Sequence, residues 1–180
     1  MKALNALILS TLFTQLSFAD FDTQKASEAA GKAKAIIIPG DDSADWVFSY
    51  KVMLGDGSTI YEWVPKGETV DDWTKLIQVQ FIPLEGQKID AKDFGDAFVK
   101  SLKEMVPEAN ASMTSTSKDR VFVEWIVPKD TKDQKAQDEL AQFISTPDGI
   151  YRVAYTEKVP AIDPQVKQKW TERLSNVKVQ

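Results

Sequence analysis

Apolar and polar residues alternate along several stretches of the chain, and turn residues bound each stretch. Residues 46–54 and 58–64 alternate in this way and flank Gly55-Asp56-Gly57, which predicts a β-hairpin with a short glycine-containing loop. Residues 76–82 predict another strand, closed by Pro83. We therefore expect the first half of the domain to be a run of antiparallel strands.

The second half of the chain shows the same alternation. Residues 111–117 are polar and compatible with a strand, and residues 121–127 predict a strand that is apolar on both faces, which is typical of a central strand. Residues 136–145 fit either a helix or a strand. The tight-turn sequence Thr146-Pro147-Asp148-Gly149 precedes a β pattern at 150–155, so we favour a strand and a second hairpin.

Two stretches instead repeat apolar residues every three or four positions, the spacing of a helix. The first follows Asp90, a good N-cap, and ends at Pro107; its apolar residues are Phe94, Ala97, Phe98, Leu102 and Met105. The second starts with Asp163 and Pro164, and its apolar residues are Val166, Trp170, Leu174 and Val177. Thr69 could also cap a single helical turn that places Trp73 on the sheet.

These elements predict an α+β fold with one mostly antiparallel sheet of about six strands and two main helices packed on it. The apolar run Ile36-Ile37-Ile38 adds a short edge strand. We assign this fold to a single α+β domain over residues 36–180.

The N-terminal residues have the pattern of an export signal. Lys2 precedes an uncharged stretch up to Leu16, and Ser17 and Ala19 place small residues where a signal peptidase requires them. We expect residues 1–19 to be a cleaved signal peptide and residues 20–35 a flexible leader. No later stretch approaches eighteen apolar residues, so we expect no stable membrane insertion.

The amino-acid composition excludes several kinds of catalytic and metal site. The chain has 180 residues, no cysteine and no histidine, and a net charge of −5. Disulfides, thiolate metal sites, histidine-based triads and most zinc sites are therefore excluded. The acidic balance argues against nucleic acid. The acidic residues of the first half match no calcium loop and are interpreted as turns and helix starts, so we expect neither a metal nor a cofactor.

Two segments resemble each other, residues 62–69 and 124–131, and each begins with Glu-Trp. Glu62 and Glu124 beside aromatic rings would suit a glycan, and two carboxylates could serve as acid and base in glycoside cleavage. The simpler interpretation is two strands that end at proline, each with a core tryptophan and a solvated glutamate. We favour the simpler one.

The tryptophans divide into two groups by position. Trp73, Trp125 and Trp170 lie on predicted inward faces and are expected in the core. Trp46 and Trp63 lie near strand ends, so these two, with Tyr61, are the aromatic candidates for a binding surface. Glu62 and Glu124 complete the candidate set.

The run from Tyr61 to Val70, with Val123-Glu124-Trp125, Asp148-Gly149-Ile150-Tyr151 and the Trp170 helix, resembles a group of small exported bacterial proteins. The arrangement also resembles the Mog1/PsbP-like α/β/α sandwich, whose members are mostly binding or assembly factors. The resemblance implies a non-catalytic role in the bacterial envelope and transfers no site residues.

We therefore expect an exported protein, periplasmic or extracellular, that acts as a non-catalytic binding or assembly accessory. The favoured partner is an envelope or secreted protein that approaches an exposed edge strand or the Trp46/Trp63 surface. The alternative is a glycan-binding protein, or a glycan hydrolase that uses Glu62 and Glu124.

Overall fold

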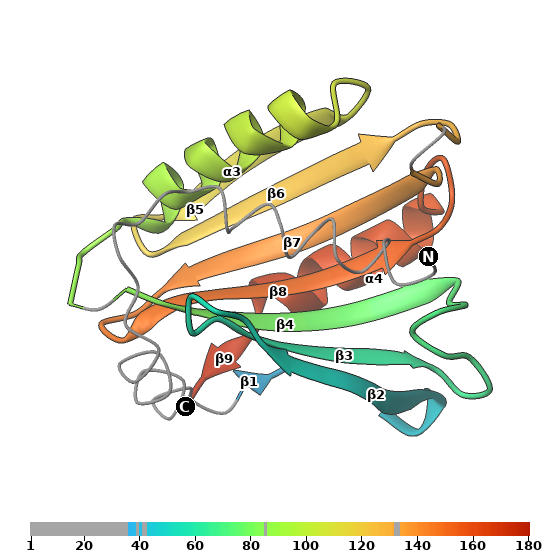
Figure 1. Cartoon of the computed structure of the whole chain (residues 1–180), viewed down its shortest axis with the longest axis horizontal. Coiled ribbons are helices and arrows are strands. Elements are labelled where there is room, and N and C mark those ends of the chain that lie inside the picture. Colours follow the sequence, from blue (N-terminus) through green and yellow to red (C-terminus); the bar gives the residue numbers. More distant parts are fainter. Residues whose placement is uncertain (1–35, 39, 41–42, 85, 132–133) are drawn as a thin grey trace.

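The computed structural model describes residues 36–180, except 39, 41–42, 85 and 132–133. Its centre is a seven-stranded antiparallel sheet with a helix on each face (Figure 1). In chain order, the elements of this layer structure are β2 (Trp46–Met53), β3 (Thr59–Pro65), β4 (Lys75–Pro83), α3 (Ala91–Met105), β5 (Asn110–Ser117), β6 (Arg120–Val127), β7 (Gln137–Ser145), β8 (Gly149–Glu157) and α4 (Pro164–Ser175). The predicted α+β class with two helices is confirmed, and the sheet has seven strands where about six were predicted.

The remaining elements are short. A 3₁₀ turn, η1 (Ser43–Asp45), leads into β2, and β1 (Ile36–Ile37) pairs with β9 (Lys178–Val179) in a separate two-stranded sheet. The strand expected from the Ile36-Ile37-Ile38 run thus exists but does not join the main sheet. The predicted signal peptide and leader, residues 1–35, lie outside the described residues.

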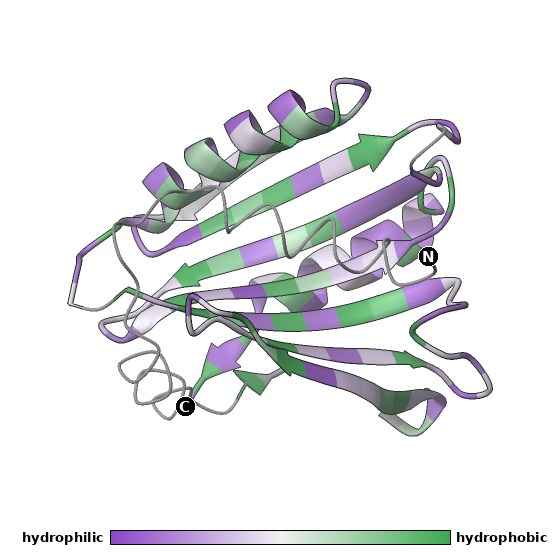
Figure 2. Cartoon of the chain, viewed as in Figure 1, coloured by the Kyte–Doolittle hydropathy of each residue, from purple (hydrophilic) through white to green (hydrophobic). Residues whose placement is uncertain are grey.

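The main sheet is built from two runs of neighbouring strands joined in the middle. Its order is β2-β3-β4-β8-β7-β6-β5, so the first three strands meet the last four where β4 pairs with β8. That pairing is long and regular, from Lys75↔Glu157 to Pro83↔Gly149. Bands of polar and apolar residues alternate along most strands (Figure 2), as expected for a sheet with two different faces.

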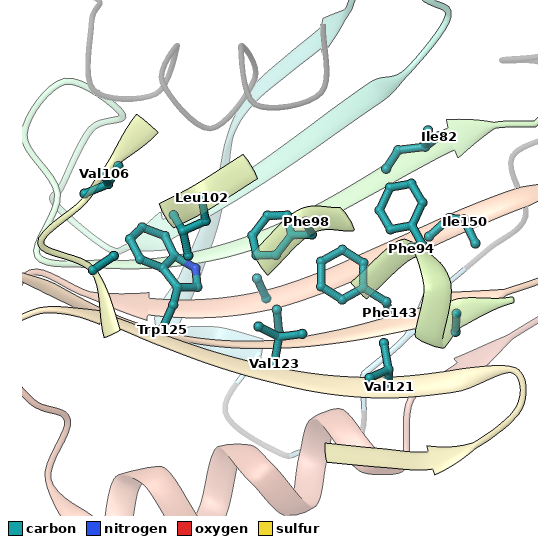
Figure 3. Packing of buried hydrophobic residues seen from close by; sticks show 14 of the residues in the cluster. Ile82, Phe94, Phe98, Leu102, Val106, Val121, Val123, Trp125, Phe143 and Ile150 are labelled. Carbon is teal, nitrogen blue, oxygen red and sulfur yellow. The ribbon is translucent and has the colours of Figure 1, made fainter. Parts of the chain in front are cut away.

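One face of the sheet packs against α3, which lies over β5, β6 and β7 (Figure 1). Phe94 and Phe98 of the helix contact Phe143 of β7, beside the buried valines of β6 (Figure 3). Gly95 lets the helix come close, because a Cβ there would lie 2.9 Å from a methyl group of Val121.

The opposite face packs against α4, which lies over β7 and β8. The helix begins as predicted: Asp163 accepts hydrogen bonds from the backbone N–H groups of Gln165 and Val166, and Pro164 takes the first helical position. The ring of Trp170 stacks on that of Tyr155 with 4.1 Å between centroids. The predicted apolar stripe of this helix is therefore its buried face.

Several local predictions from the sequence can be compared with the elements that the structure contains. The strand favoured for residues 136–145 exists as β7, over 137–145, and Thr146-Pro147-Asp148-Gly149 turns into β8. The helical turn expected after Thr69 is wrong: Thr69 forms an isolated bridge with Asp72, whose N–H it accepts in a tight turn, while Trp73 is buried as expected. Asp90 does precede α3, but its side chain makes no cap hydrogen bond.

Candidate functional site

The most conspicuous surface feature is the first strand of the sheet, β2. Among the described residues, the large hydrophobic side chains that are exposed all belong to it: Val47 (44%), Phe48 (53%), Tyr50 (38%) and Met53 (52%). Isolated apolar residues are common on protein surfaces, but here four lie on one strand, Phe48 and Met53 on one face of the sheet and Val47 and Tyr50 on the other. The strand is also an outer strand of the sheet, so we call its free side the β2 edge.

The sequence explains why residues 46–53 form a strand that continues into a hairpin. Aromatic and β-branched residues favour extended backbone, and the following loop reverses the chain. Asp56 accepts a hydrogen bond from the N–H of Ser58, and Gly57 adopts φ = +76°. The result is the predicted hairpin with β3, which satisfies one side of β2 and leaves the other without a described neighbour.

The hydrogen bonds to β3 determine which backbone groups of β2 face away from the sheet. Leu54 donates to the carbonyl of Ser58, and Lys66 donates to the carbonyl of Asp45, so Leu54 and Asp45 face β3. Backbone groups point to opposite sides at successive residues of an antiparallel strand. With the register given below, the outward-facing residues are Trp46, Phe48, Lys51 and Met53.

A β-bulge interrupts this alternation in the middle of the strand. Phe48 pairs with Trp63 and Tyr50 pairs with Glu62, so Ser49 is one residue more than β3 supplies. A bulge of this kind bends an edge strand and re-aims its side chains. The alternation of apolar and polar residues along 46–54 does not predict this bulge.

Aromatic rings gather on the α4 side of β2 and β3, and we call Phe48, Tyr61 and Trp63 the aromatic patch. Trp63 lies between the other two, with centroid distances of 5.6 Å to Phe48 and 6.4 Å to Tyr61. The ammonium group of Lys51 lies 5.2 Å from the Tyr61 ring. Tyr61 and Trp63 are half-buried, so Trp63 is not the fully buried core tryptophan of the simpler interpretation and both rings present part of their surface. The structure thus brings two predicted binding residues together and adds Phe48.

Trp46 lies on the same side of the sheet but packs inward. Its ring meets Tyr155 and Trp170 edge-on, with centroids 6.2 Å and 6.0 Å away. It is half-buried, so it anchors the start of β2 to the core under α4 and presents only part of its surface. Of the three aromatic candidates, it is the one held most by the core.

Glu62 is not on this surface. It is 2% exposed on the α3 side, so the expectation of a solvated glutamate is wrong at this position. Its carboxylate accepts a hydrogen bond from Gln78 Nε2 (2.7 Å). Burial raises the pKa of Glu62, and the Gln78 hydrogen bond and the Arg152 charge partly oppose that rise.

Glu62 belongs to a larger buried set that we call the polar network: Glu62, Gln78, Glu139, Arg152 and Thr156. Arg152 donates to both Gln78 and Glu139, and Thr156 donates to Glu139 at 3.1 Å. These groups are at most 3% exposed, so each depends on its neighbours for hydrogen bonding. The network connects four neighbouring strands from β3 to β7 and leaves little freedom for a ligand.

Glu124 has a different environment. It is half-buried on β6 and pairs with Lys167 of α4, which also lies 3.5 Å from the buried carboxylate of Asp138. Burial lowers the pKa of Lys167, but the hydrogen bond to Glu124 and the charge of Asp138 outweigh it and raise that pKa. This ion pair ties α4 to the sheet.

The register shows that Glu62 and Glu124 cannot form one site. Glu62 is in line with Gln78 and Ala154 on the α3 side, whereas Glu124 is in line with Leu140 and Tyr155 on the α4 side. Four strand spacings separate β3 from β6, or about 19 Å at 4.8 Å each. A glycosidase needs two carboxyl groups within about 10 Å on one substrate.

Other site types can be checked on the part of the chain that the structure describes. It contains no group of three or more acidic side chains that could hold a metal ion. None of its helices combines the length and apolar character needed to cross a membrane.

Sequence reasoning missed Phe48 and the polar network. Phe48 could have been found, because it stands beside Val47 in a strand with one charged residue. Gln78 and Gln80 alternate with apolar residues in 76–82, which normally indicates a solvated face. Gln78 bonds to Arg152, and Gln80 is opposite Arg152 in the register of β4 and β8, so their burial depends on a strand far away in sequence and no local signal could reveal it.

The comparisons with known proteins now add one finding. A model of an uncharacterised protein family matches residues 45–180. The chain belongs to this family. The match begins at the start of β2 and covers the whole seven-stranded sheet and both helices, so the β2 edge is part of the family's common region. No curated protein matches the chain.

Proposed function

We propose that this protein is an exported, non-catalytic binding or assembly accessory of the bacterial envelope, and that it binds an extended segment of another protein along the β2 edge. The single observation that carries the proposal is the exposure of Val47, Phe48, Tyr50 and Met53 on an outer strand. Outer strands normally carry charges or proline that discourage pairing. Apart from Lys51, this one carries neither.

Strand addition would use both the backbone and the side chains of β2. The added strand would hydrogen-bond to the outward-facing residues and cover the exposed apolar side chains. Fully burying one such side chain stabilises by about 1.5–3 kcal/mol, so four that are half-exposed offer about 3–6 kcal/mol. Association itself costs about 4–15 kcal/mol, so the backbone hydrogen bonds must contribute as well.

The proposal is tested by photocrosslinking in intact producing cells. A photoreactive residue at Met53, on the β2 edge, should yield an adduct with an envelope or secreted protein that mass spectrometry identifies. The matched control is the same residue at Thr114, which is exposed on β5 at the opposite edge of the sheet. Equal capture of that protein from both positions would contradict the proposal.

A pair of substitutions at Lys51 makes the test specific for strand addition. Lys51→Pro removes an outward N–H and keeps the hydrogen bonds to β3, whereas Lys51→Ala removes the same side chain and keeps the N–H. The adduct should disappear with Lys51→Pro and persist with Lys51→Ala. Loss with both variants would assign recognition to the lysine side chain instead.

Glycan binding is the alternative, and the stacked rings of Tyr61 and Trp63 are the observation that favours it. A glycan that stacks on the aromatic patch should change tryptophan fluorescence when cell-wall oligosaccharides are added. Trp63→Ala should abolish the change, and Trp73→Phe, in the core, should not. Absence of any change would leave the protein partner as the better account.

A further inference from the structure

The outward-facing residues of β2 have a symmetric spacing. Trp46 and Phe48 are two positions apart, as are Lys51 and Met53, while the bulge places both Ser49 and Tyr50 between the two pairs. The spacing is therefore the same when the strand is read in either direction. An antiparallel copy of the same strand has its irregular step at the same place.

From this symmetry we propose that, in the free protein, a second copy of the chain occupies the β2 edge. The two strands would pair about a two-fold axis between Ser49 and Tyr50, so that the two seven-stranded sheets become one. The inference rests on the proposed function, because it names the first occupant of the same edge. A protein partner would then replace the second copy.

The pairing gives favourable neighbours at each position. Phe48 of one copy faces Lys51 of the other, and Trp46 faces Met53, which allows cation–π and sulfur–aromatic contacts. Val47 faces Val52 on the other side of the sheet. Lys51 is the one charged residue of β2, and it does not face its own counterpart, so the pairing contains no direct repulsion.

A regular strand fits less well. β3 is regular, and its pairing with β2 leaves Ser49 without a partner. A regular strand on the outer side would meet the same mismatch, whereas a second β2 matches it residue for residue. The bulge thus favours self-pairing over pairing with an arbitrary extended segment, and exposed apolar residues on both sides of the strand favour a cover that reaches both.

The first experiment measures the mass of the purified chain in solution. Sedimentation equilibrium over a range of concentrations should give twice the chain mass. Lys51→Pro should raise the dimer dissociation constant at least about tenfold, because the two-fold axis makes each substitution act twice. Lys51→Ala, which keeps both N–H groups, should change it much less. Circular dichroism checks that both variants keep the native fold.

The second experiment tests the register and does not depend on the proline variant. The chain has no cysteine, so introduced thiols react without background. Val47→Cys combined with Val52→Cys places two cysteines opposite each other across the axis, within disulfide range. The double variant should form a covalent dimer on mild oxidation, and neither single variant should, because Val47 lies five positions away from its own counterpart.

The outcomes separate this inference from the proposed function. A monomer at all concentrations, or a dimer that is unaffected by Lys51→Pro and not crosslinked by the double cysteine variant, overturns the self-pairing. Capture of an envelope protein at Met53 would still support the proposed function in that case. A dimer that captures no other protein in cells would support self-pairing and contradict the proposed function.

Discussion

Several glutamates and glutamines of the sheet are buried, so each of them needs hydrogen-bond partners from neighbouring side chains or backbone. Glu62, Gln78, Glu139 and Arg152 occupy interior positions, where an unpaired polar group costs about 1–3 kcal/mol. The network supplies hydrogen bonds to all four side chains, although Arg152 Nε has no partner among the described residues, so the effect of changing one of them depends on which neighbours lose a partner. Gln78 and Gln80 provide a matched comparison, because both are glutamines buried on the same side of β4.

Gln78→Leu should destabilise the protein, and Gln80→Leu should not. Gln78 bonds to both Glu62 and Arg152, so its removal leaves two buried polar groups without that partner, at a cost of about 2–6 kcal/mol. Gln80 Nε2 has no hydrogen-bond partner among the described residues, so leucine removes an unsatisfied donor and should leave stability unchanged or raise it. Urea unfolding measures both, and equal losses would contradict the assignment.

Glu62→Gln should flatten the dependence of stability on pH. Burial raises the pKa of Glu62 above 4.5 in the folded state, so the folded state binds this proton more tightly than the unfolded state. The resulting stability is complete below pH 4.5 and is lost as the pH rises through the raised pKa. The free energy of unfolding of the wild type should therefore fall between acidic and neutral pH more steeply than that of Glu62→Gln.

The control for that comparison is Glu104→Gln, a substitution at an exposed position of α3. It should leave the pH profile of the wild type unchanged. A Glu62→Gln profile parallel to that of the wild type would show that the carboxyl group does not titrate differently in the folded state. Denaturant unfolding at several pH values supplies all three profiles.

At the scale of elements, local chemistry accounts for most of the architecture. Gly55-Asp56-Gly57 and Thr146-Pro147-Asp148-Gly149 predict the turns of the β2–β3 and β7–β8 hairpins, and the favoured strand at 136–145 follows from the second turn. The bulge at Ser49 was not predictable, because it depends on the register with β3, and the local turn from Thr69 to Asp72 was predicted as a helical turn instead. Local preference decides which element forms, and pairing decides its irregularities.

Gly95→Ala in α3 should destabilise the protein although alanine favours helices. The gain in helix propensity is about 1 kcal/mol, but the new Cβ would lie 2.8 Å from Met113 Sδ and 2.9 Å from a Val121 methyl group. Val121 is fully buried and cannot move far. Thermal unfolding should show a lower midpoint for the variant.

A double-mutant cycle isolates the cause. In a Val121→Ala background, Gly95→Ala should destabilise much less, because the methyl group of Val121 is gone and only Met113, a flexible side chain, has to move. The same loss in both backgrounds would show that the helix does not depend on this close approach.

For the whole molecule, the α+β class and the two helices were predictable, but the strand order was not. The turn residues of a hairpin indicate which two strands pair. The contact between β4 and β8 instead joins residues more than sixty positions apart, and no local pattern indicates it. The candidate site was likewise predictable only in part. Tyr61 and Trp63 were predicted and lie together, while the burial of Glu62 and its separation from Glu124 follow from that long-range pairing.

The export prediction is tested on the mature protein. If residues 1–19 are removed as a signal peptide, the protein recovered from producing cells should begin at Asp20. Intact-mass analysis and N-terminal sequencing of the envelope and medium fractions measure this directly. Recovery of a chain that starts at Met1 from the cytosol alone would contradict it.

The central place of β8 affects when the molecule can become ordered. Strands β2, β3 and β4 come first in the chain, yet their inner neighbour is the last strand of the main sheet, Gly149–Glu157. During synthesis, β4 therefore has no partner on its inner side until residues 149–157 have left the ribosome. Contacts between distant segments also slow ordering. If the chain is exported, as we propose, the late arrival of β8 would delay completion of the sheet and so favour passage of the unfolded chain through a translocation pore.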